Sequence, residues 1–392
     1  MKLIKSTIAF IAVLSLFSAC TKVDVPVENE LTPGDFPKTQ AQFILASGTA
    51  YAKFRDSYAS SYWQQQSLST DEAVLPTRGS NWYDGGRYQD MHYHSWTPDN
   101  AIVAASWAWG FGTISSCNQV LTLFAQSPDS DAKLNIVAEM RTLRAITYFM
   151  MMDSFGNIPV TTTFGDPALP KTQNRAAVFA FIEKEVLDAL PRLSETMGTS
   201  TYGRPTKYAA YALLAKLYLN AEVYIGTPRY NDAVTMCDNI IKSGKFTLTT
   251  DYFAMFKPDN GPATPEFIFA VPYDAQQAKN ETFTWSGLHY ALSAKYGLSW
   301  RISGPTSTIP EYYANFNDPT DVRNASWLTG KQYDFSGNPV TIATTKSGLD
   351  ANYKGADGST PITWQLEFSP DITLVNPANF DAGSDVLSSA KG

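Results

Sequence analysis

Over residues 39–58 and again from about residue 101 to 244, apolar side chains recur every three or four positions, which predicts a series of amphipathic α-helices. The first helix is expected over 39–58, where apolar residues fall at Phe43, Leu45, Ala46, Ala50 and Phe54. The sequence TPDN then offers an N-terminal cap for a second helix, expected from Ala101 to Phe124.

Further helical patterns follow along the chain. A long one starts near residue 127 and is expected to stop at Gly156, because glycine and the Pro159 that follows both end helices. Another is expected over 174–193, with its end near Pro191. The last two, over 204–224 and 229–244, are joined by the short sequence IGTP.

In this last pair of helices, small side chains alternate with large ones. The small positions are Ala209, Ala210, Ala215, Ala221 and Ala233. Small side chains let two helix backbones approach closely, so the alternation is typical of tetratricopeptide-like hairpins. The predicted fold class is mostly α, a tetratricopeptide-like helical hairpin scaffold with a loop-rich ligand-binding lobe.

Two segments, 60–98 and the chain beyond Tyr252, show no sustained period and are expected to form that lobe. Structureless segments of this length in a compact domain are usually functional or disordered, and the many aromatic residues argue against disorder. Within the second segment, the sequence PEFIFAVPYD predicts a short strand.

The N-terminus has two early lysines and then an apolar run, Ile8 to Phe17, that is too short to span a bilayer. This layout is typical of a secretory signal peptide, expected over residues 1–19. Cys20 follows directly, as bacterial lipoprotein processing requires, so its thiol is the predicted site of lipid attachment. The alternatives are an ordinary signal peptide followed by a chance cysteine, or an uncleaved anchor. Residues 20–38 carry three prolines and no helical pattern, which predicts a lipid-anchored tether.

Composition and charge narrow the range of partners. The net charge of −7 means that neither nucleic acid nor an anionic membrane surface would attract the chain as a whole. Cys117 and Cys237 indicate neither a disulfide framework nor a zinc site. No phosphate-binding loop or dinucleotide fingerprint occurs, so no cofactor is expected.

Aromatic residues make up 13% of the chain, and many fall in the segment 60–98 and just beyond it. An exposed flat ring can cover the apolar face of a sugar, while Asp, Asn and Arg side chains bond its hydroxyls. Trp82 and Tyr83 stand between glycine and polar neighbours, where burial is difficult, and are candidates for surface binding. The other candidates here are Asp71, Arg78, Asn81 and Trp96. For Trp107 and Trp109, which lie on a predicted helix, core packing is expected.

Catalysis and metal binding are alternative roles for polar residues in the same segment. A glycosidase needs two carboxylates about 5 to 9.5 Å apart, and the acids between Asp71 and Asp90 leave such a pair open. Acids at this density are common in solvated loops, so catalysis is not expected. The sequence HYH at 92–94 would place two imidazoles on one face of a strand, but no third metal ligand is apparent.

Four sequence segments, in order behind the N-terminal signal, resemble the SusD/RagB family of Bacteroidetes outer-membrane nutrient-uptake lipoproteins. They are STDEAVLPTRGSNW, AEMRTLRAITYFMMMDSFGNIPV, YGRPTKYAAYALLAKLYLNAEVY and FNDPTDVRNASWLTG. The resemblance covers nearly all of the chain after residue 38 and implies a SusD-like α-α superhelix over 39–392. Family members continue further into helical hairpins, so the C-terminal part of the family fold is expected to be missing.

The resemblance also implies a role. Such proteins are lipid-anchored on the cell surface in the outer membrane, bind oligosaccharides or polysaccharides, and deliver them to a SusC-like TonB-dependent transporter. They are binding proteins rather than enzymes, and some members hold peptides, which stays open as an alternative beside a secreted glycoside hydrolase. Because the family builds its aromatic site partly from later loops, Tyr296 and Trp300 join the candidates.

Overall fold

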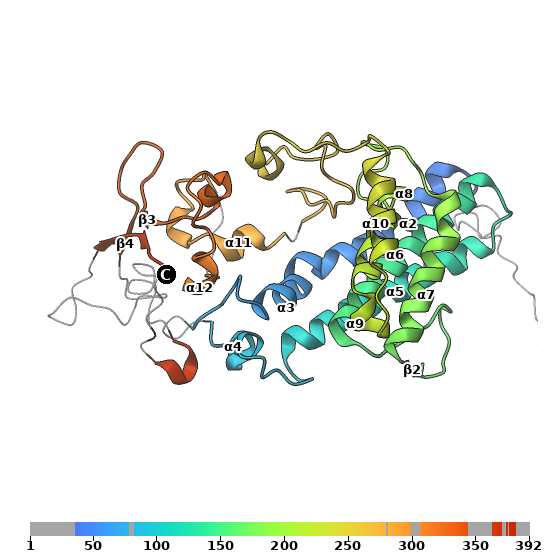
Figure 1. The fold of residues 1–392 in the computed structure, drawn as a ribbon, viewed down its shortest axis with the longest axis horizontal. Helices are drawn as coiled ribbons and strands as arrows, with labels where there is room; N and C mark the ends of the chain where they lie inside the picture. Colours follow the sequence, from blue (N-terminus) through green and yellow to red (C-terminus); the bar gives the residue numbers. More distant parts are fainter. Residues whose placement is uncertain are drawn as a thin grey trace, which may run out of the picture.

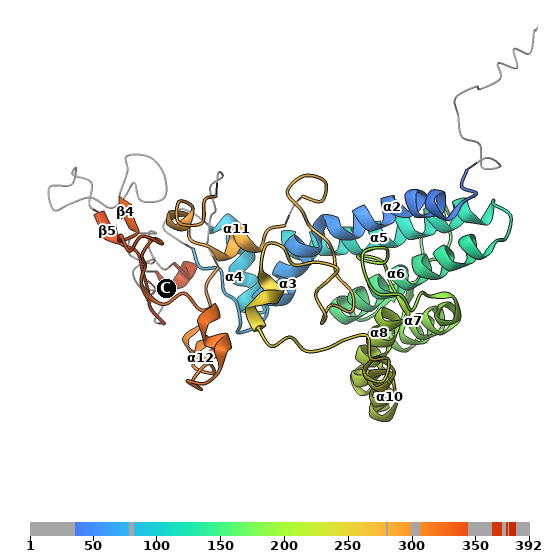
Figure 2. The ribbon, with the colours of Figure 1, turned by 90° about the horizontal axis from the view of Figure 1, so that it is seen from above.

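The computed structural model describes residues 36–77, 82–279, 281–298, 306–343, 363–370, 374 and 376–381. Two regions follow one another along the long axis of the molecule, as both views of the ribbon show (Figure 1, Figure 2). The helical body comprises residues 36–62 and 101–250, on the right in Figure 1. The loop-rich lobe comprises the described residues of 63–100 and 251–381.

The helical body contains six long helices, one short helix and a two-stranded antiparallel ribbon. They are α2 (Gln40–Ser57), α5 (Ala101–Ala125), α6 (Asp131–Phe155), β1 (Ile158–Pro159), β2 (Thr172–Gln173), α7 (Arg175–Ala189), α8 (Lys207–Leu219), α9 (Ala221–Ile225) and α10 (Tyr230–Ile241). Among the described residues, no helix combines the length and the apolar character that a membrane span requires.

Local capping explains where these helices begin and end. The Thr39 side chain accepts a hydrogen bond from the backbone N–H of Gln42, whose own side chain bonds back, so α2 starts with a complete capping box. The Asn100 and Ser130 side chains cap α5 and α6 by accepting one hydrogen bond each, from the backbone N–H of Ile102 and of Lys133. Gly156 ends α6 with φ at 74°, a conformation that glycine adopts without strain. Both ends of α2 and α5 and the C-terminal end of α6 are confirmed within about two residues, whereas α6 starts at Asp131, about four residues later than predicted.

The long helices pack as neighbouring antiparallel pairs, α2 with α5, α6 with α7, and α8 with α10. Their facing sides form one continuous core that includes Phe124, Tyr148 and Leu214, each fully buried. The predicted mostly helical hairpin scaffold is confirmed. One predicted helix, 204–224, is interrupted at Asn220 and forms α8 and α9.

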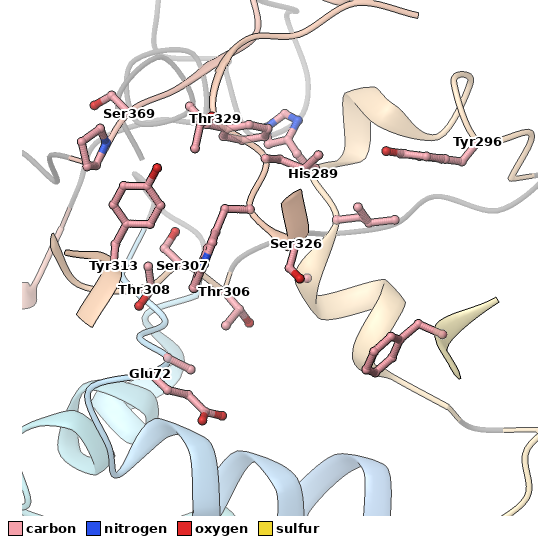
Figure 3. Close-up of a pocket in the computed structure, with 18 of the residues that line it drawn as sticks. Glu72, His289, Tyr296, Thr306, Ser307, Thr308, Tyr313, Ser326, Thr329 and Ser369 are labelled. Atoms are coloured by element: carbon pink, nitrogen blue, oxygen red, sulfur yellow. The ribbon is translucent and has the colours of Figure 1, made fainter. Parts of the chain in front are cut away.

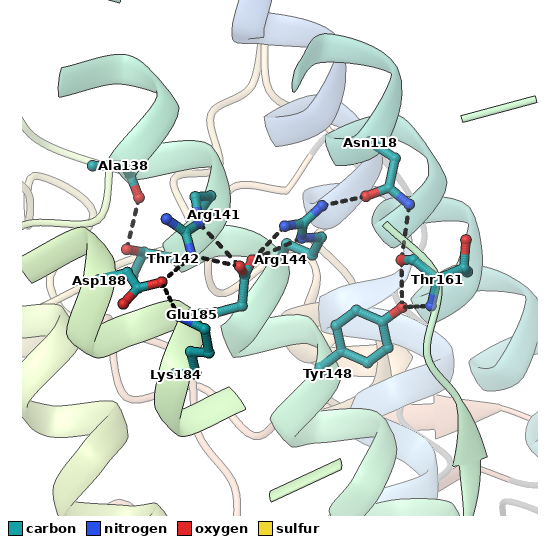
Figure 4. A network of polar contacts seen from close by, with 10 residues as sticks. All are labelled: Asn118, Ala138, Arg141, Thr142, Arg144, Tyr148, Thr161, Lys184, Glu185 and Asp188. Carbon is teal, nitrogen blue, oxygen red and sulfur yellow. Dashed lines mark hydrogen bonds and ion pairs between the residues drawn. The ribbon is translucent and has the colours of Figure 1, made fainter. Parts of the chain in front are cut away.

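A buried ion network ties α6 to α7 (Figure 4). The Glu185 carboxylate accepts hydrogen bonds from Arg141 Nε at 2.9 Å and from Arg144 Nε at 3.0 Å. Arg144 and Glu185 are only 5% and 6% exposed, so each charge depends on the other for its stabilisation.

The same network reaches α5 and the segment after α6. Arg144 Nη1 donates to Asn118 Oδ1 at 2.6 Å, and Asn118 Nδ2 donates to the Thr161 carbonyl at 3.1 Å. The Tyr148 hydroxyl both donates to that carbonyl and accepts from the Thr161 N–H, at 2.9 Å each. Three helices and the chain leaving α6 are therefore fixed to one another by polar contacts as well as by packing (Figure 4).

The loop-rich lobe holds only short elements between long connections. They are α3 (Trp63–Leu68), α4 (Arg87–His92), α11 (Phe283–Gly287), α12 (Pro310–Tyr313), β3 (Gly330–Lys331), β4 (Thr341–Ala343), β5 (Thr363–Gln365) and β6 (Glu367–Phe368). Strand β3 pairs with β6 and β4 with β5, both antiparallel. Small separate clusters, one of them around Leu292 and Leu366, replace the continuous core of the body.

Two sequence predictions for the irregular segments are wrong. The segment 60–98 contains α3 and α4 rather than loop alone. The sequence PEFIFAVPYD forms no strand; instead, its side chains fasten it to the helical body. Phe269 packs near Phe54, with ring centroids 6.4 Å apart, and the Tyr273 hydroxyl donates to the Arg55 carbonyl at 2.7 Å. Its apolar residues thus make side-chain contacts with the body. In the sequence, the same apolar pattern would also fit a strand in a sheet, so the two cannot be told apart there.

Candidate ligand-binding site

A pocket of about 730 Å³ opens in the loop-rich lobe. Its wall joins Glu72 and Ala73, which follow α3, to segments that lie more than 170 residues further along the chain. A short backbone bridge makes this junction: Val74 N–H donates to the Ser307 carbonyl at 2.7 Å, and Ser307 N–H donates to the Val74 carbonyl at 2.8 Å. The pocket therefore exists only because the two irregular segments meet.

Aromatic rings form much of the pocket wall. They are Phe253, Phe256, Tyr296, Tyr313, Trp327 and Phe368. Trp327 is fixed by edge contacts with two neighbouring rings, Tyr313 at 5.5 Å and Phe316 at 5.1 Å between centroids. Tyr296 is 39% exposed and packs against Phe335 at 5.8 Å. The rings are thus held in place while part of their surface stays open.

Hydroxyl groups alternate with these rings around the pocket. They belong to Tyr296, Thr306, Ser307, Thr308, Tyr313, Ser326, Thr329 and Ser369. Figure 3 shows Tyr296 and Tyr313 on opposite sides of the pocket, with Glu72 at one edge and Thr329 and Ser369 at the other. Rings and hydroxyls together can cover an apolar face and bond a polar rim of the same ligand.

Two buried polar atoms of pocket residues have no hydrogen-bond partner in the part of the chain that the structure describes. They are Thr306 Oγ1 and Trp327 Nε1. A buried polar group without a partner costs free energy, and such groups are rare in folded proteins. Unsatisfied atoms in the wall of a pocket are consistent with a site whose bonding is completed by water or a ligand.

The charged groups around the pocket are mostly engaged with each other. Arg323 pairs with Asp321 and holds the pKa of that carboxyl below its usual value. The Lys295 ammonium lies 5.6 Å from the centroid of the Tyr296 ring and 5.4 Å from that of Phe335. Glu72 is the charged residue among the described lining, and its carboxylate accepts a hydrogen bond from Ser67 Oγ at 2.8 Å.

Of the residues singled out from the sequence, the structure places Tyr296 in the pocket wall and Asp71 beside it. The Asp71 side chain is exposed, and its carbonyl accepts a hydrogen bond from Thr308 Oγ1 at 3.4 Å. Trp82, Tyr83 and Trp96 do not line this pocket. Arg78, Asn81, Trp300 and the proposed lipidation site Cys20 lie outside the described residues.

Trp82 is half-buried rather than fully exposed. Its ring meets Trp285 edge to face at 5.4 Å and Tyr88 at 6.0 Å, beside a small cluster of buried apolar residues. The side chain of Gln89 holds the turn: its Nε2 lies 3.1 Å from the Leu75 carbonyl and 3.3 Å from the Trp82 carbonyl, both of which accept its hydrogen bonds. Gln89 thereby fixes the loop on which Trp82 stands.

Tyr83 and Trp96 present more open ring surface, 46% and 42% exposed. Trp109 is buried at 2% exposure, as expected, and its indole N–H donates to the Phe54 carbonyl at 2.8 Å. Trp107 differs from its expected core role: it is 39% exposed and packs on Phe111 and Phe155 at the helix surface.

The HYH sequence does not lie on a strand. His92 ends α4, and His94 follows with φ at 54°, so the two rings leave the backbone in different conformations. Burial lowers the pKa of His92, although the Asp71 carboxylate opposes that shift. Within the described ranges, no three His, Cys, Asp or Glu side chains come together as a metal site would require.

Sequence reasoning missed most of the pocket. Phe253, Phe256, Tyr313 and Trp327 were not among the candidates, although all lie in aromatic-rich sequences within the second irregular segment, YFAMF, EYYANF and NASW. The available signal was the density of rings there. Which of those rings face a common pocket depends on how the loops close, and no local pattern records that.

Comparison with known proteins identifies one matching family model and several relatives of this chain. The sequence model of a SusD-like family, described as starch-binding and associating with the outer membrane, matches residues 28–219. SusD-like protein P2 of Formosa agariphila is 24% identical over 88% of this chain and 66% of its own length. The starch-binding protein SusD of Bacteroides thetaiotaomicron is 29% identical over 65% of this chain. This chain therefore spans 47–66% of the length of these two relatives.

Solved structures with the same fold are also SusD-like. A SusD homologue from Bacteroides thetaiotaomicron aligns with a TM-score of 0.63 at 18% identity, over 78% of this chain and 61% of its own. A surface glycan-binding protein A from the same species, solved with laminarihexaose, aligns with a TM-score of 0.62 at 19% identity, over 73% and 62%. At these identities the likeness shows a common fold. Taken with the sequence matches, it supports a SusD-like family protein.

Proposed function

We propose that this chain binds oligosaccharides, with the pocket of the loop-rich lobe as its principal ligand site. The observation that carries the proposal is the lining of that pocket, where six aromatic rings alternate with hydroxyl groups. Sugar rings have an apolar face and a hydroxyl rim, and this lining matches both. A starch-binding relative and a laminarihexaose complex in the same family support a carbohydrate ligand.

The exposed rings of Tyr83 and Trp96 extend the proposed site beyond the pocket. Together with Trp82 and Asp71 they belong to the first irregular segment, which also supplies Glu72 to the pocket wall. Arg78, Asn81 and Trp300 are further proposed contacts, in stretches adjoining the described residues. An oligosaccharide longer than the pocket would then find ring surface on both irregular segments.

The proposed setting is the outer membrane, with a lipid on Cys20 and residues 20–38 as a tether. A SusC-like TonB-dependent transporter is the proposed partner that receives the ligand. Support comes from the N-terminal signal pattern and from the description of the matching family as associating with the outer membrane. Tethering beside a transporter raises the effective ligand concentration, so modest affinity suffices.

Binding without catalysis fits the described pocket better than hydrolysis. A glycosidase needs two facing carboxylates, whereas Glu72 supplies the one carboxylate among the described lining residues. A hydrolase would release new reducing ends when incubated with polysaccharide, and the proposal expects no such release.

Isothermal titration with a panel of oligosaccharides tests the proposal. We expect Tyr296→Ala to weaken binding of the best ligand by about tenfold, because an open ring face in contact with a ligand contributes about 1–2 kcal/mol. The melting temperature should change little, since Tyr296 is 39% exposed.

Tyr230→Ala is the matched control, because Tyr230 is 49% exposed but lies on α10, in the helical body. Equal losses in both variants would contradict the proposed site. Binding of peptides with no binding of any oligosaccharide would replace the proposed ligand class by the peptide alternative.

A further inference from the structure

We infer that this pocket selects uncharged oligosaccharides and discriminates against acidic ones, an inference that rests on the proposed oligosaccharide function and goes further by naming the ligand's charge. The first step is the chemistry of the lining. Beside its rings and hydroxyls, the described wall carries one charged side chain, the carboxylate of Glu72, and one imidazole, that of His289.

His289 is nearly buried in the pocket wall, with 7% of the residue exposed. Its Nδ1 accepts a hydrogen bond from the Ala291 backbone N–H at 3.2 Å. That ring nitrogen is therefore engaged with the chain's own backbone rather than directed at a ligand.

The cations near the pocket make other contacts within the chain and do not line it. Arg323 pairs with Asp321, and Lys257 lies 3.4 Å from Asp251, each outside the lining. Lys295 lies over the rings of Tyr296 and Phe335. Among the described lining residues, none is a lysine or arginine that could pair with a carboxylate or sulfate of a ligand.

An acidic sugar would therefore lose hydration in the pocket and gain no counter-charge from the described lining residues. Moving an ionised group out of water without a partner is costly, and the Glu72 carboxylate adds repulsion. The net charge of −7 acts in the same direction at longer range. A neutral sugar meets none of these costs, since the hydroxyls of Thr308 and Thr329 can exchange hydrogen bonds with its own.

The test compares matched ligands. A panel of neutral hexose oligosaccharides, including fragments of starch and laminarin, identifies one that binds in isothermal titration. Its counterpart, with the primary hydroxyls oxidised to carboxylates, is then titrated at low and at high salt. We expect the oxidised ligand to bind at least about tenfold more weakly at low salt, and the difference to shrink at high salt as repulsion is screened.

Glu72→Lys should bring the affinities for the neutral and the oxidised ligand closer together or reverse their order, because it replaces the repelling charge by an attracting one. Glu311→Lys is the control: Glu311 is exposed on α12 but does not line the pocket, so it should move the ratio much less.

Equal or tighter binding of the oxidised ligand to the unaltered protein would overturn the inference and leave the oligosaccharide function intact. A ratio that Glu72→Lys leaves unchanged would overturn the role given to this pocket. If neither neutral nor acidic oligosaccharides bind, both the inference and the proposed function fail.

Discussion

The helical body and the loop-rich lobe use the same aromatic residue types for opposite purposes. In the body, Trp109 and Tyr148 are buried, and the polar atom of each is bonded to backbone. In the lobe, Tyr83 and Tyr296 leave about two fifths or more of their surface open, and the indole nitrogen of Trp327 lacks a described partner. Exposure alone does not separate the regions, because Trp107 on α5 is also 39% exposed; what distinguishes the lobe is that several of its rings line one pocket.

The two regions also differ in where their ion pairs lie. Buried ion pairs lock the helices of the body together, as Glu185 does with Arg141 and Arg144. In the lobe, Arg323 and Asp321 are neighbours in sequence and pair locally at the surface. The body is therefore built to be rigid, while the lobe keeps polar and aromatic surface available.

The largest expected effect is the loss of the buried ion network. Glu185→Ala leaves Arg144 buried without its counter-charge, which should lower the free energy of unfolding by about 3–5 kcal/mol. Urea unfolding followed by circular dichroism measures it. Asp188→Ala is the matched control, because Asp188 bonds the same Arg141 from an exposed position, and it should cost far less. Similar costs for the two variants would refute a dominant role for the buried pair.

A matched pair of leucines sharpens the comparison of the two regions. Leu214 and Leu366 are both fully buried, the first in the continuous core of the body and the second in the small cluster of the lobe. Removal of a buried leucine side chain costs about 2–5 kcal/mol, and more where the site cannot collapse. We expect Leu214→Ala to lower the global stability by the larger amount.

Leu366→Ala should instead loosen mainly the lobe, because stability differs between regions of a structure. Hydrogen exchange would then increase around β5 and β6 with little change in α6. A uniform increase across both regions would break the comparison, since it would mean that body and lobe unfold as one unit.

The smallest expected effect comes from His92, on α4. Burial lowers its pKa in the folded state, so the folded protein binds its proton less readily than the unfolded chain does. Its contribution to stability is complete above the unfolded pKa of about 6.5 and is lost as the pH falls through that value. As the pH falls from 7.5 to 5.5, we expect the free energy of unfolding to decrease slightly less for His92→Gln than for the unaltered protein. Urea unfolding at each pH measures this difference.

Other groups also titrate in this range, so the comparison needs a control. Burial lowers the pKa of His92, the Asp71 carboxylate raises it, and His94 lowers it. His94→Gln removes an exposed imidazole from the same loop. If the two variants show the same dependence on pH, burial of His92 has no measurable consequence.

The helices of the body could be predicted well because their signals are local. Thr39, Asn100 and Ser130 each lie one residue before a helix and cap it. Gly156 ends α6 where a left-handed backbone is needed. Apolar periodicity then marks the face that each helix buries. Each of these signals is contained within a few residues of sequence.

The pocket could not be predicted to the same extent, because its wall is assembled from distant residues. Ala73 and Thr306 become neighbours through the bridge between Val74 and Ser307. The strand expected in PEFIFAVPYD failed for a related reason, since Phe269 and Tyr273 bind the helical body rather than a neighbouring strand.

The sequence by itself determined the helical class of the body, the helix ends and the aromatic richness of the irregular segments. Only the tertiary structure decided that Trp82 is half-buried against Trp285, that Trp107 stays partly exposed, and that Tyr296 shares a pocket with Glu72. The physical reason is the range of the interactions. Caps and helical periodicity act over one or two turns, whereas exposure and pocket shape depend on contacts between residues that are far apart along the chain.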